Sequence, residues 1–197
     1  MIENIQKSIK DSISVKNEIL NNPLMISEIE KIASATIQAY KNGNKTIFAG
    51  NGGSAGDSQH LAGELVSRFY FDRPALASIS LTTDTSILTA IGNDYGYEQV
   101  FSRQIEANGN AGDIFFAIST SGNSQNIIQA VKVAKEKNII VVGFTGKNGG
   151  ELAKLSDFII KVPSDSTPRI QESHILIGHI VAELVEKKLF NNSEFTK

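Results

Sequence analysis

The chain has 197 residues, a formal net charge of −2 and no cysteine. This length suits a single globular unit with its own hydrophobic core, and the 41% hydrophobic and 20% charged residues are ordinary for such a protein. Lysine and arginine are scattered along the chain, which argues against binding to nucleic acid or to an anionic membrane and favours a small ligand.

The same composition bears on the cellular compartment. Without cysteine the chain can form neither a disulfide nor a thiolate zinc site, which is consistent with a reducing environment. The N-terminal stretch lacks the apolar core of a signal peptide, and no segment reads as a membrane span. We therefore expect a cytoplasmic protein.

Residues 1–43 are predicted to form two amphipathic helices, separated by a break at Asn21-Asn22-Pro23. In the first helix, isoleucines recur at positions 2, 5, 9 and 13. The apolar stripe of the second helix consists of Ile29, Ile32, Ala33, Ile37 and Tyr40. Neither helix carries groups suited to chemistry, so we interpret residues 1–43 as a packing and oligomerisation unit and expect a homo-oligomer.

Residues 44–197 alternate between short apolar runs and helical segments. The runs are "TIFAG", "LASISL", "DIFFAIS", "IIVVGFT" and "DFIIKV". This alternation predicts an α/β fold with a five-stranded, parallel, doubly wound sheet of the flavodoxin-like kind. The segment "RIQESHILIGHIVAELVEKKLF" is predicted to be a long closing helix, since its apolar positions share a face and its lysines gather near the end.

Two loops follow strands and precede helices, where parallel sheets form ligand crevices. Gly50–Ala55 follows the first strand, and Ser119–Ser124, "STSGNS", follows the third. Glycine permits close approach of the backbone, and a helix N-terminus presents free N–H groups. The second loop adds four hydroxyl groups, which favours a phosphate site over the alternative of a simple helix cap.

The first loop also matches the pattern G-x-G-x-x-A of dinucleotide-binding proteins. Such a site needs an acidic residue at the end of the following strand to bind the ribose. Here that strand ends in Ser80, Leu81, Thr82 and Thr83, and Asp84 opens the next helix. We therefore expect no nucleotide cofactor.

Histidine and glutamate in the predicted helices are candidates for chemistry. His60 and Glu64 are spaced i, i+4 on a helix that starts near Ser54, so they share one face, as either a functional pair or a surface pair. His179 lies among apolar residues, so it is either a core histidine or a partner of His60. His174 lacks such a frame and is expected to be exposed or bridging.

Five ordered blocks carry a resemblance to a known family. They are "GNGGSAGDSQHLAGEL", "TAIGNDYGYEQVFSRQ", "ISTSGNS", "TGKNGGELA" and "RIQESHILIGH". Together they resemble the sugar isomerase (SIS) family and, within it, the phosphoheptose isomerases. The resemblance covers nearly the whole chain.

This resemblance implies conversion of sedoheptulose 7-phosphate into D-glycero-D-manno-heptose 7-phosphate, for the heptose of lipopolysaccharide and related surface glycans. It implies Glu64 as the base and His179 as the acid/base partner in proton transfer through an enediolate. The substrate contacts that it implies are Asn51, Gly52, Gly53, Ser54, Glu64, Asn93, Asp94, Ser119, Thr120, Ser121, Ser124 and Gln171.

The family is also associated with zinc, at positions that correspond to His60, Glu64, Gln171 and His179. Gln171 and His179 are eight residues apart, roughly 12 Å along a regular helix. Sharing one ion would need side chains that lean together, an irregular first turn or a residue from another subunit. We therefore expect the site at a subunit interface, with a tetramer as the oligomer.

Three other interpretations stay open. One is a non-catalytic SIS-fold tetramer that binds a replication initiator protein, although that relative has an incomplete His/Glu constellation. Another is an isomerase of a different phosphosugar. The third, a SIS-fold regulator of transcription, is disfavoured because residues 1–43 are neither basic nor arranged as a helix-turn-helix.

Pro168 occupies a position where some relatives carry an acidic residue. The role of that acid would be unfilled here or would fall to Asp165. The simpler interpretation of Pro168 is that it is the first residue of the closing helix.

Overall fold

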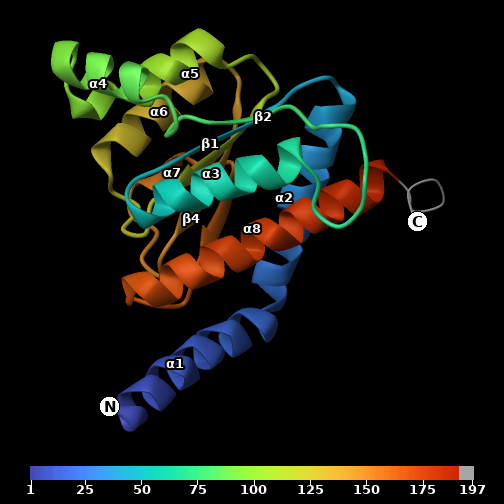
Figure 1. Ribbon diagram of the computed structural model, residues 1–197, viewed down its shortest axis with the longest axis vertical. Helices are drawn as coiled ribbons and strands as arrows, with labels where there is room; N and C mark the ends of the chain where they lie inside the picture. Colours follow the sequence, from blue (N-terminus) through green and yellow to red (C-terminus); the bar gives the residue numbers. More distant parts are fainter. Residues whose placement is uncertain (191–197) are drawn as a thin grey trace.

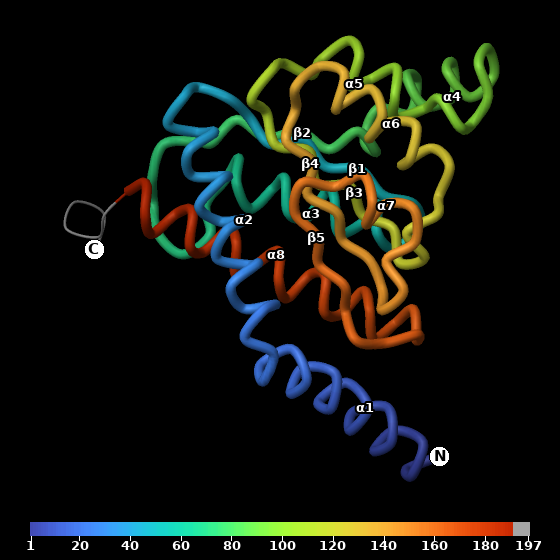
Figure 2. The backbone as a smooth tube through the Cα atoms, turned by 180° about the vertical axis from the view of Figure 1, so that it is seen from behind, coloured from blue at the N-terminus to red at the C-terminus, as the bar shows by residue number. Residues whose placement is uncertain are grey.

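The computed structural model describes residues 1–190 of the chain (Figures 1 and 2). The strands are β1 Thr46–Gly50, β2 Ser78–Ser80, β3 Ile114–Ile118, β4 Ile140–Thr145 and β5 Phe158–Lys161. The helices are α1 Ile2–Leu20, α2 Pro23–Lys41, α3 Gly53–Val66, α4 Thr85–Asp94, the 3-10 helix η1 Tyr97–Gln99, α5 Ser102–Asn108, α6 Gln125–Glu136, α7 Leu152–Leu155 and α8 Thr167–Leu189.

The five strands form one parallel sheet in the order β2-β1-β3-β4-β5, which confirms the predicted doubly wound, flavodoxin-like architecture. From β1 the chain proceeds to β2 on one side, and β3 returns on the other side. Gly50 pairs with Ile118, so β1 and β3 end level with each other. The glycine loop and the Ser/Thr loop therefore flank the switch point of the sheet, where ligands bind in folds of this kind.

Helices cover both faces of the sheet, so alternate residues of a strand enter different cores. Phe116 of β3 lies in the core beneath α2, α3 and α8, whereas its neighbour Phe115 lies in the core beneath α5 and α6. Burial on both faces explains why these strands read as continuous apolar runs. Among residues 1–190, no helix has the combined length and hydropathy needed to cross a membrane.

The two N-terminal helices have different surroundings. Helix α2 packs into the core beside α8, with Ile29 and Ile32 buried. Helix α1 extends away from the body of the molecule (Figure 1) and buries only Val15 and Ile19. Its predicted apolar stripe faces solvent: the exposed fractions are 72% for Ile2, 54% for Ile5, 56% for Ile9 and 53% for Ile13.

Helix α8 corrects two expectations. His174 is fully buried, not exposed: its Nε2 donates to the carbonyl of Thr145 (3.1 Å) and its ring lies against Phe144. Position 174 lies on the face of α8 that packs on the sheet, and the neighbouring sequence did not show which face that is. The helix also begins at Thr167, so Pro168 is its second residue rather than its first.

Burial of His174 predicts a pH dependence of stability. Desolvation lowers the pKa of His174 from 6.5 to about 4, and the hydrogen bond to Thr145 only partly opposes this shift. The unfolded chain therefore binds the proton more readily, so stability is retained above pH 6.5 and falls by up to about 3 kcal/mol as the pH drops toward 4.

The measurement is the free energy of unfolding in denaturant at pH 7 and pH 4.5, for wild type and His174→Gln. Glutamine stays neutral over this range, so we expect a smaller loss for the variant. The comparison also cancels the opposite contribution of Asp57, whose pKa is raised to about 6 by burial. Equal losses in both proteins would contradict this account of His174.

Candidate active site

The glycine turn after β1 positions helix α3. A side chain at Gly50 would meet the carbonyl oxygen of Ser54 at 2.5 Å, and Gly52 has a positive φ of 55°. Both features require glycine, because the chain reverses here over very few residues. Gly53 lies against the side-chain amide of Gln171, so the start of α3 contacts the start of α8 directly.

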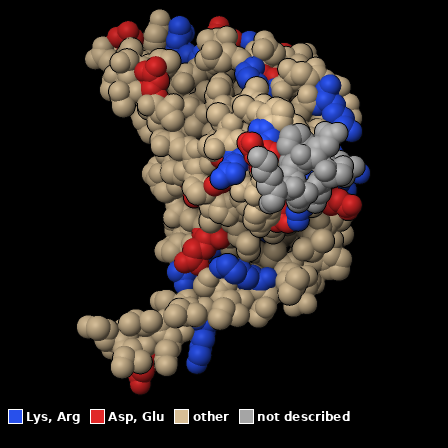
Figure 3. Space-filling model, turned by 45° about the vertical axis from the view of Figure 1, so that its right-hand side comes forward, with Lys and Arg blue, Asp and Glu red and all other residues tan. Residues whose placement is uncertain are grey.

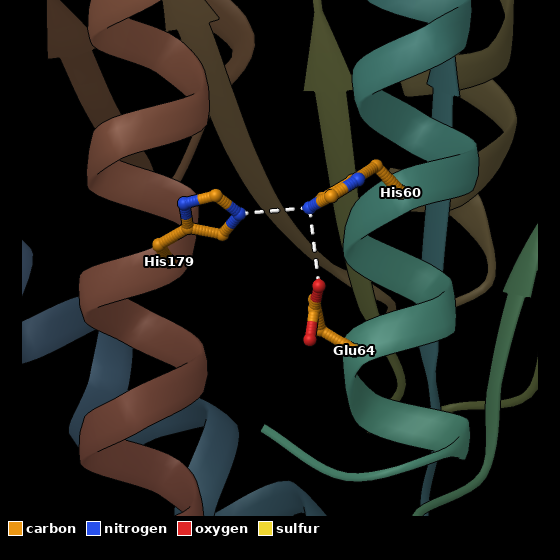
Figure 4. A group of neighbouring side chains, drawn as sticks. All are labelled: His60, Glu64 and His179. Atoms are coloured by element: carbon orange, nitrogen blue, oxygen red, sulfur yellow. Dashed lines mark hydrogen bonds and ion pairs between the residues drawn. The ribbon is translucent and has the colours of Figure 1, made fainter. Parts of the chain in front are cut away.

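Three side chains from α3 and α8 converge two turns further along α3 (Figure 4). The Nε2 atom of His60 lies 2.9 Å from Nε2 of His179 and 3.1 Å from Oε1 of Glu64. Gly178 permits this approach of the two helices, since a Cβ there would stand 2.5 Å from a methyl group of Leu61. We name His60, Glu64 and His179 the triad.

The triad is arranged for proton transfer or metal binding. Its ligand atoms all lie within 4.8 Å of one another, and they comprise two imidazole nitrogens and a carboxylate oxygen. Burial lowers the pKa of His179 and the neighbouring His60 lowers it further, against an opposing effect of Glu64. Neutral imidazole is the form that coordinates a metal or accepts a proton.

Asp57 lies one turn before His60 on the same helix, and sequence analysis did not single it out. Burial raises its pKa to about 6, while the nearby His60 opposes the shift. Its Oδ2 atom is buried and has no hydrogen-bond partner among residues 1–190. A carboxyl group with such a pKa beside the triad is typical of an active-site environment.

Side-chain hydrogen bonds join the loop after β1 to the first turn of α6, which follows the Ser/Thr loop. Asn51 and Asn126 exchange two hydrogen bonds, from Asn51 Nδ2 (2.9 Å) and from Asn126 Nδ2 (2.8 Å). Tyr97 donates its hydroxyl to Asn51 Oδ1 at 3.0 Å. The amide of Asn51 is thereby fixed in orientation at the switch point. Asn126 and Tyr97 were not identified from the sequence, because only the tertiary structure brings them to Asn51.

The hydroxyl groups of the Ser/Thr loop are close together. Ser119 Oγ lies 2.9 Å from Ser124 Oγ and 3.5 Å from Ser121 Oγ. Ser124 is also the N-cap of α6, and its hydroxyl makes no cap hydrogen bond within the described chain; its contact with Ser119 leaves the hydroxyl able to bind a ligand as well. Hydroxyl donors grouped at a helix N-terminus are suited to bind a phosphate.

The segment between β4 and α7 packs against the Ser/Thr loop. Leu152 N donates to Gly122 O at 2.9 Å, and Glu151 N donates to Asn123 Oδ1 at 2.9 Å. Gly122 has a positive φ of 69°, and a Cβ there would overlap the backbone of Gly149 and stand 2.6 Å from its carbonyl carbon. The two loops can pack this closely only with glycine at position 122.

Gly122→Ala is therefore expected to separate the loops and disturb the hydroxyl cluster. We expect a loss of stability of about 1–3 kcal/mol from backbone strain and overpacking. The KM for a phosphosugar should rise more than kcat falls, because the binding site is moved and the triad is not. Gly56→Ala is the control, since a Cβ at Gly56 meets no atom within 4 Å; equal KM values for both variants would contradict the prediction.

Other predicted site residues lie apart from the triad. Gln171 faces Gly53 at the start of α3, so this chain brings together three of the four expected metal ligands. Asn93 and Asp94 are exposed at the end of α4, where Asn93 Nδ2 donates to Asp94 Oδ1 at 2.7 Å. Gly52 and Gly53 are exposed, Ser54 is buried with its carbonyl accepting from Ser58, and Thr120 is half-buried.

Comparison with known proteins agrees with this architecture. Residues 14–146 match the family model for the SIS domain. The chain therefore belongs to the SIS-domain proteins. It is 62% identical over 192 residues to a phosphoheptose isomerase of Aneurinibacillus thermoaerophilus, covering 98% of this chain and 97% of that protein. It is 60% identical to phosphoheptose isomerase 2 of Campylobacter jejuni, with 96% of each chain covered.

Solved structures give the same result. The phosphoheptose isomerase GmhA from Neisseria gonorrhoeae is 41% identical with a TM-score of 0.88, and a phosphoheptose isomerase from Francisella tularensis is 37% identical with a TM-score of 0.90. Each match covers 94% of this chain and 98% of the other. Within the SIS-domain proteins, the chain belongs to the phosphoheptose isomerase family.

Proposed function

We propose that this chain is an aldose-ketose isomerase that converts sedoheptulose 7-phosphate into D-glycero-D-manno-heptose 7-phosphate. The observation that carries the proposal is the triad, in which a carboxylate and two imidazoles meet between α3 and α8. The product would supply heptose for lipopolysaccharide or a capsule. The proposed substrate is a water-soluble phosphosugar, which is consistent with the predicted cytoplasmic location.

In the proposed isomerisation, Glu64 and His179 transfer protons and the other site residues bind the substrate. Glu64 removes a proton from C1 of the ketose, leaving an enediolate, and the proton returns to C2 to give the aldose. His179 moves the proton between the oxygens on C1 and C2, which its neutral imidazole can do in both directions. Ser119, Thr120, Ser121 and Ser124 bind the phosphate. The sugar hydroxyls are assigned to Asn51, Gly52, Gly53, Ser54, Asn93, Asp94 and Gln171.

Zinc is proposed as the cofactor. The donor set of His60, Glu64 and His179 fits this ion, and Gln171 is proposed as a fourth ligand, from the same chain after rearrangement or from a neighbouring copy. Bound zinc would polarise the sugar oxygens as a Lewis acid. A metal-bound carboxylate is a weaker base than a free one, so we assign Glu64 to proton transfer first and to the metal second.

The decisive experiment is to incubate the purified protein with sedoheptulose 7-phosphate and to look for a new aldose phosphate. We expect conversion in both directions. A protein that leaves this substrate unchanged but isomerises another phosphosugar would support that alternative. Inactivity toward all of them would favour the non-catalytic SIS-fold tetramer that binds a replication initiator protein.

A homotetramer is proposed from the surface of α1. Figure 3 shows this helix projecting at the bottom of the molecule with mostly uncharged side chains. Its isoleucine stripe is more than half exposed, and a regular apolar stripe on a projecting helix is typical of a subunit contact. Residues 1–43 are accordingly proposed as the oligomerisation unit beside the SIS domain, residues 44–197.

Replacing Ile5, Ile9 and Ile13 together by lysine should dissociate the oligomer, because three charges cannot be buried in an apolar contact. Light scattering after size exclusion should give four times the chain mass for wild type and a smaller multiple for the variant.

The control places the same three charges elsewhere on α1, with lysine at the exposed positions Asn4, Gln6 and Asn17. It should keep the mass of wild type. A monomeric wild-type protein that is stable and fully active would contradict both the oligomer and the interface location of the site.

A further inference from the structure

A buried ion pair joins the C-terminal ends of the two helices that carry the triad. Arg73 Nε donates to Glu186 Oε2 at 2.9 Å, and both side chains have an exposed fraction of 0%. Glu186 also accepts from the backbone N–H groups of Phe69 and Tyr70, each at 2.7 Å. Burial alone would raise the pKa of Glu186, but the two N–H groups and Arg73 hold it below its ordinary value. Glu186 is therefore ionised.

Arg73 binds the end of α3 at the residue that carries the proposed base. Its Nη2 donates to the carbonyl of Glu64 at 2.9 Å, and its Nη1 donates to the carbonyl of Leu65 at 2.8 Å. These carbonyls belong to the last turn of α3, where carbonyls have no N–H partner within the helix, and Leu65 O also accepts from Leu76 N at 3.2 Å. The planar guanidinium thus fixes the backbone of Glu64 in position and direction.

Glu186 connects the same group to His179. It lies seven residues after His179 on α8, two turns along the same face of the helix. The loop that it holds through Phe69 N places the ring of Phe69 against His179, with centroids 5.6 Å apart. One pair of side chains therefore contacts the backbone of Glu64 and, through Phe69, the ring of His179.

We propose that Arg73 and Glu186 are positioning residues, which set the distance and orientation between Glu64 and His179 for proton transfer. This assignment rests on the proposed isomerase function. Apolar residues could fill the same volume at comparable stability, but they would not direct the last carbonyls of α3 or the N–H groups of the loop. Catalysis is sensitive to such placement, since a displacement of about 1 Å can cost on the order of 100-fold in rate.

The test compares two buried carboxylates of similar construction. Asp113 accepts from Lys45 Nζ (2.5 Å) and from the backbone N–H groups of Lys45 (3.0 Å) and Asn110 (2.8 Å), and its side chain is 1% exposed. It precedes β3 at the amino end of that central strand, and its hydrogen-bond partners Asn44, Lys45 and Asn110 are not members of the triad. Asp113→Asn is therefore a matched control that perturbs a buried ion pair without touching the site.

Glu186→Gln replaces one acceptor oxygen by an NH₂ group, which cannot accept from the loop or from Arg73. We expect kcat to fall by about 30- to 100-fold with KM within about threefold, since substrate contacts are unchanged. Asp113→Asn should lower the denaturation midpoint by a similar amount but leave kcat within about twofold of wild type.

A second variant, Arg73→Lys, tests the same proposal if Glu186→Gln does not fold. Arg73→Lys keeps the buried positive charge but lacks the fork that reaches the carbonyls of both Glu64 and Leu65. We expect a fall in kcat of about tenfold or more at nearly unchanged KM. Values of kcat near wild type in Glu186→Gln and Arg73→Lys would overturn the positioning role alone. An inactive wild type would overturn the proposed function and this assignment with it.

Discussion

Glu64→Gln is expected to lower kcat for sedoheptulose 7-phosphate by about 10²- to 10⁴-fold, the usual contribution of a general base. Glutamine has nearly the shape of glutamate but cannot accept the carbon-bound proton. The carboxylate lies 3.1 Å from His60 Nε2, and the other two members of the triad are imidazoles, so the triad holds no second carboxylate that could replace it. Substrate affinity, measured by calorimetry with the inactive variant, should stay within a few-fold of wild type.

Glu183→Gln is the matched control. Glu183 lies one turn after His179 on α8, but its carboxylate pairs with Lys187 at 2.5 Å and is outside the triad. Its removal should leave kcat unchanged. Turnover by Glu64→Gln at more than about a tenth of the wild-type rate would refute the assignment of Glu64 as the base, because loss of a general base costs far more.

Removal of zinc is expected to have the second large effect. Protein purified without a chelator should contain one zinc ion per chain, and chelation should lower activity by at least about 10²-fold, with recovery on adding zinc. His60→Ala should lower zinc affinity by at least about 100-fold, because it deletes the ligand whose Nε2 lies between His179 and Glu64. Metal analysis and titration with a zinc indicator provide both measurements.

His174→Gln is the control for His60→Ala, since His174 is buried, with its Nε2 bonded to the carbonyl of Thr145 and its ring against Phe144. It should retain the metal. Zinc binding by Glu64→Gln separates the two roles of that residue: wild-type affinity with lost turnover identifies a base alone, and loss of both identifies a base that is also a ligand. Full activity in metal-free protein would refute zinc as the cofactor.

One part of the triad was predictable from the sequence, and another part was not. The i, i+4 spacing of His60 and Glu64 follows from helical geometry, and the structure places both on one face of α3. The choice between His174 and His179 could not be made in the same way. Both lie on α8, and the side of the helix that packs on the sheet decides that His174 is buried and His179 meets His60.

The supporting residues lay beyond sequence analysis for a related reason. Asn126 is 75 residues from Asn51, and Glu186 is 113 residues from Arg73, so no spacing along the chain indicates either contact. An asparagine in a helix or an arginine in a loop has no local signature of its partner. Gln171 is a similar case: its amide lies against Gly53 at the start of α3, and its role as a metal ligand stays a prediction.

The amino-acid sequence was therefore sufficient to predict the local elements, which are the five strands, the amphipathic helices, the glycine and Ser/Thr loops, and the shared helix face of His60 and Glu64. These elements depend on residues that are close together in the sequence, so the pattern of residue types is sufficient to predict them. Only the tertiary structure showed the packing of α3 on α8, the burial of His174 and the ion pair between Arg73 and Glu186. They depend on which helix faces meet across the sheet, and that is decided by the summed packing of residues distant in sequence.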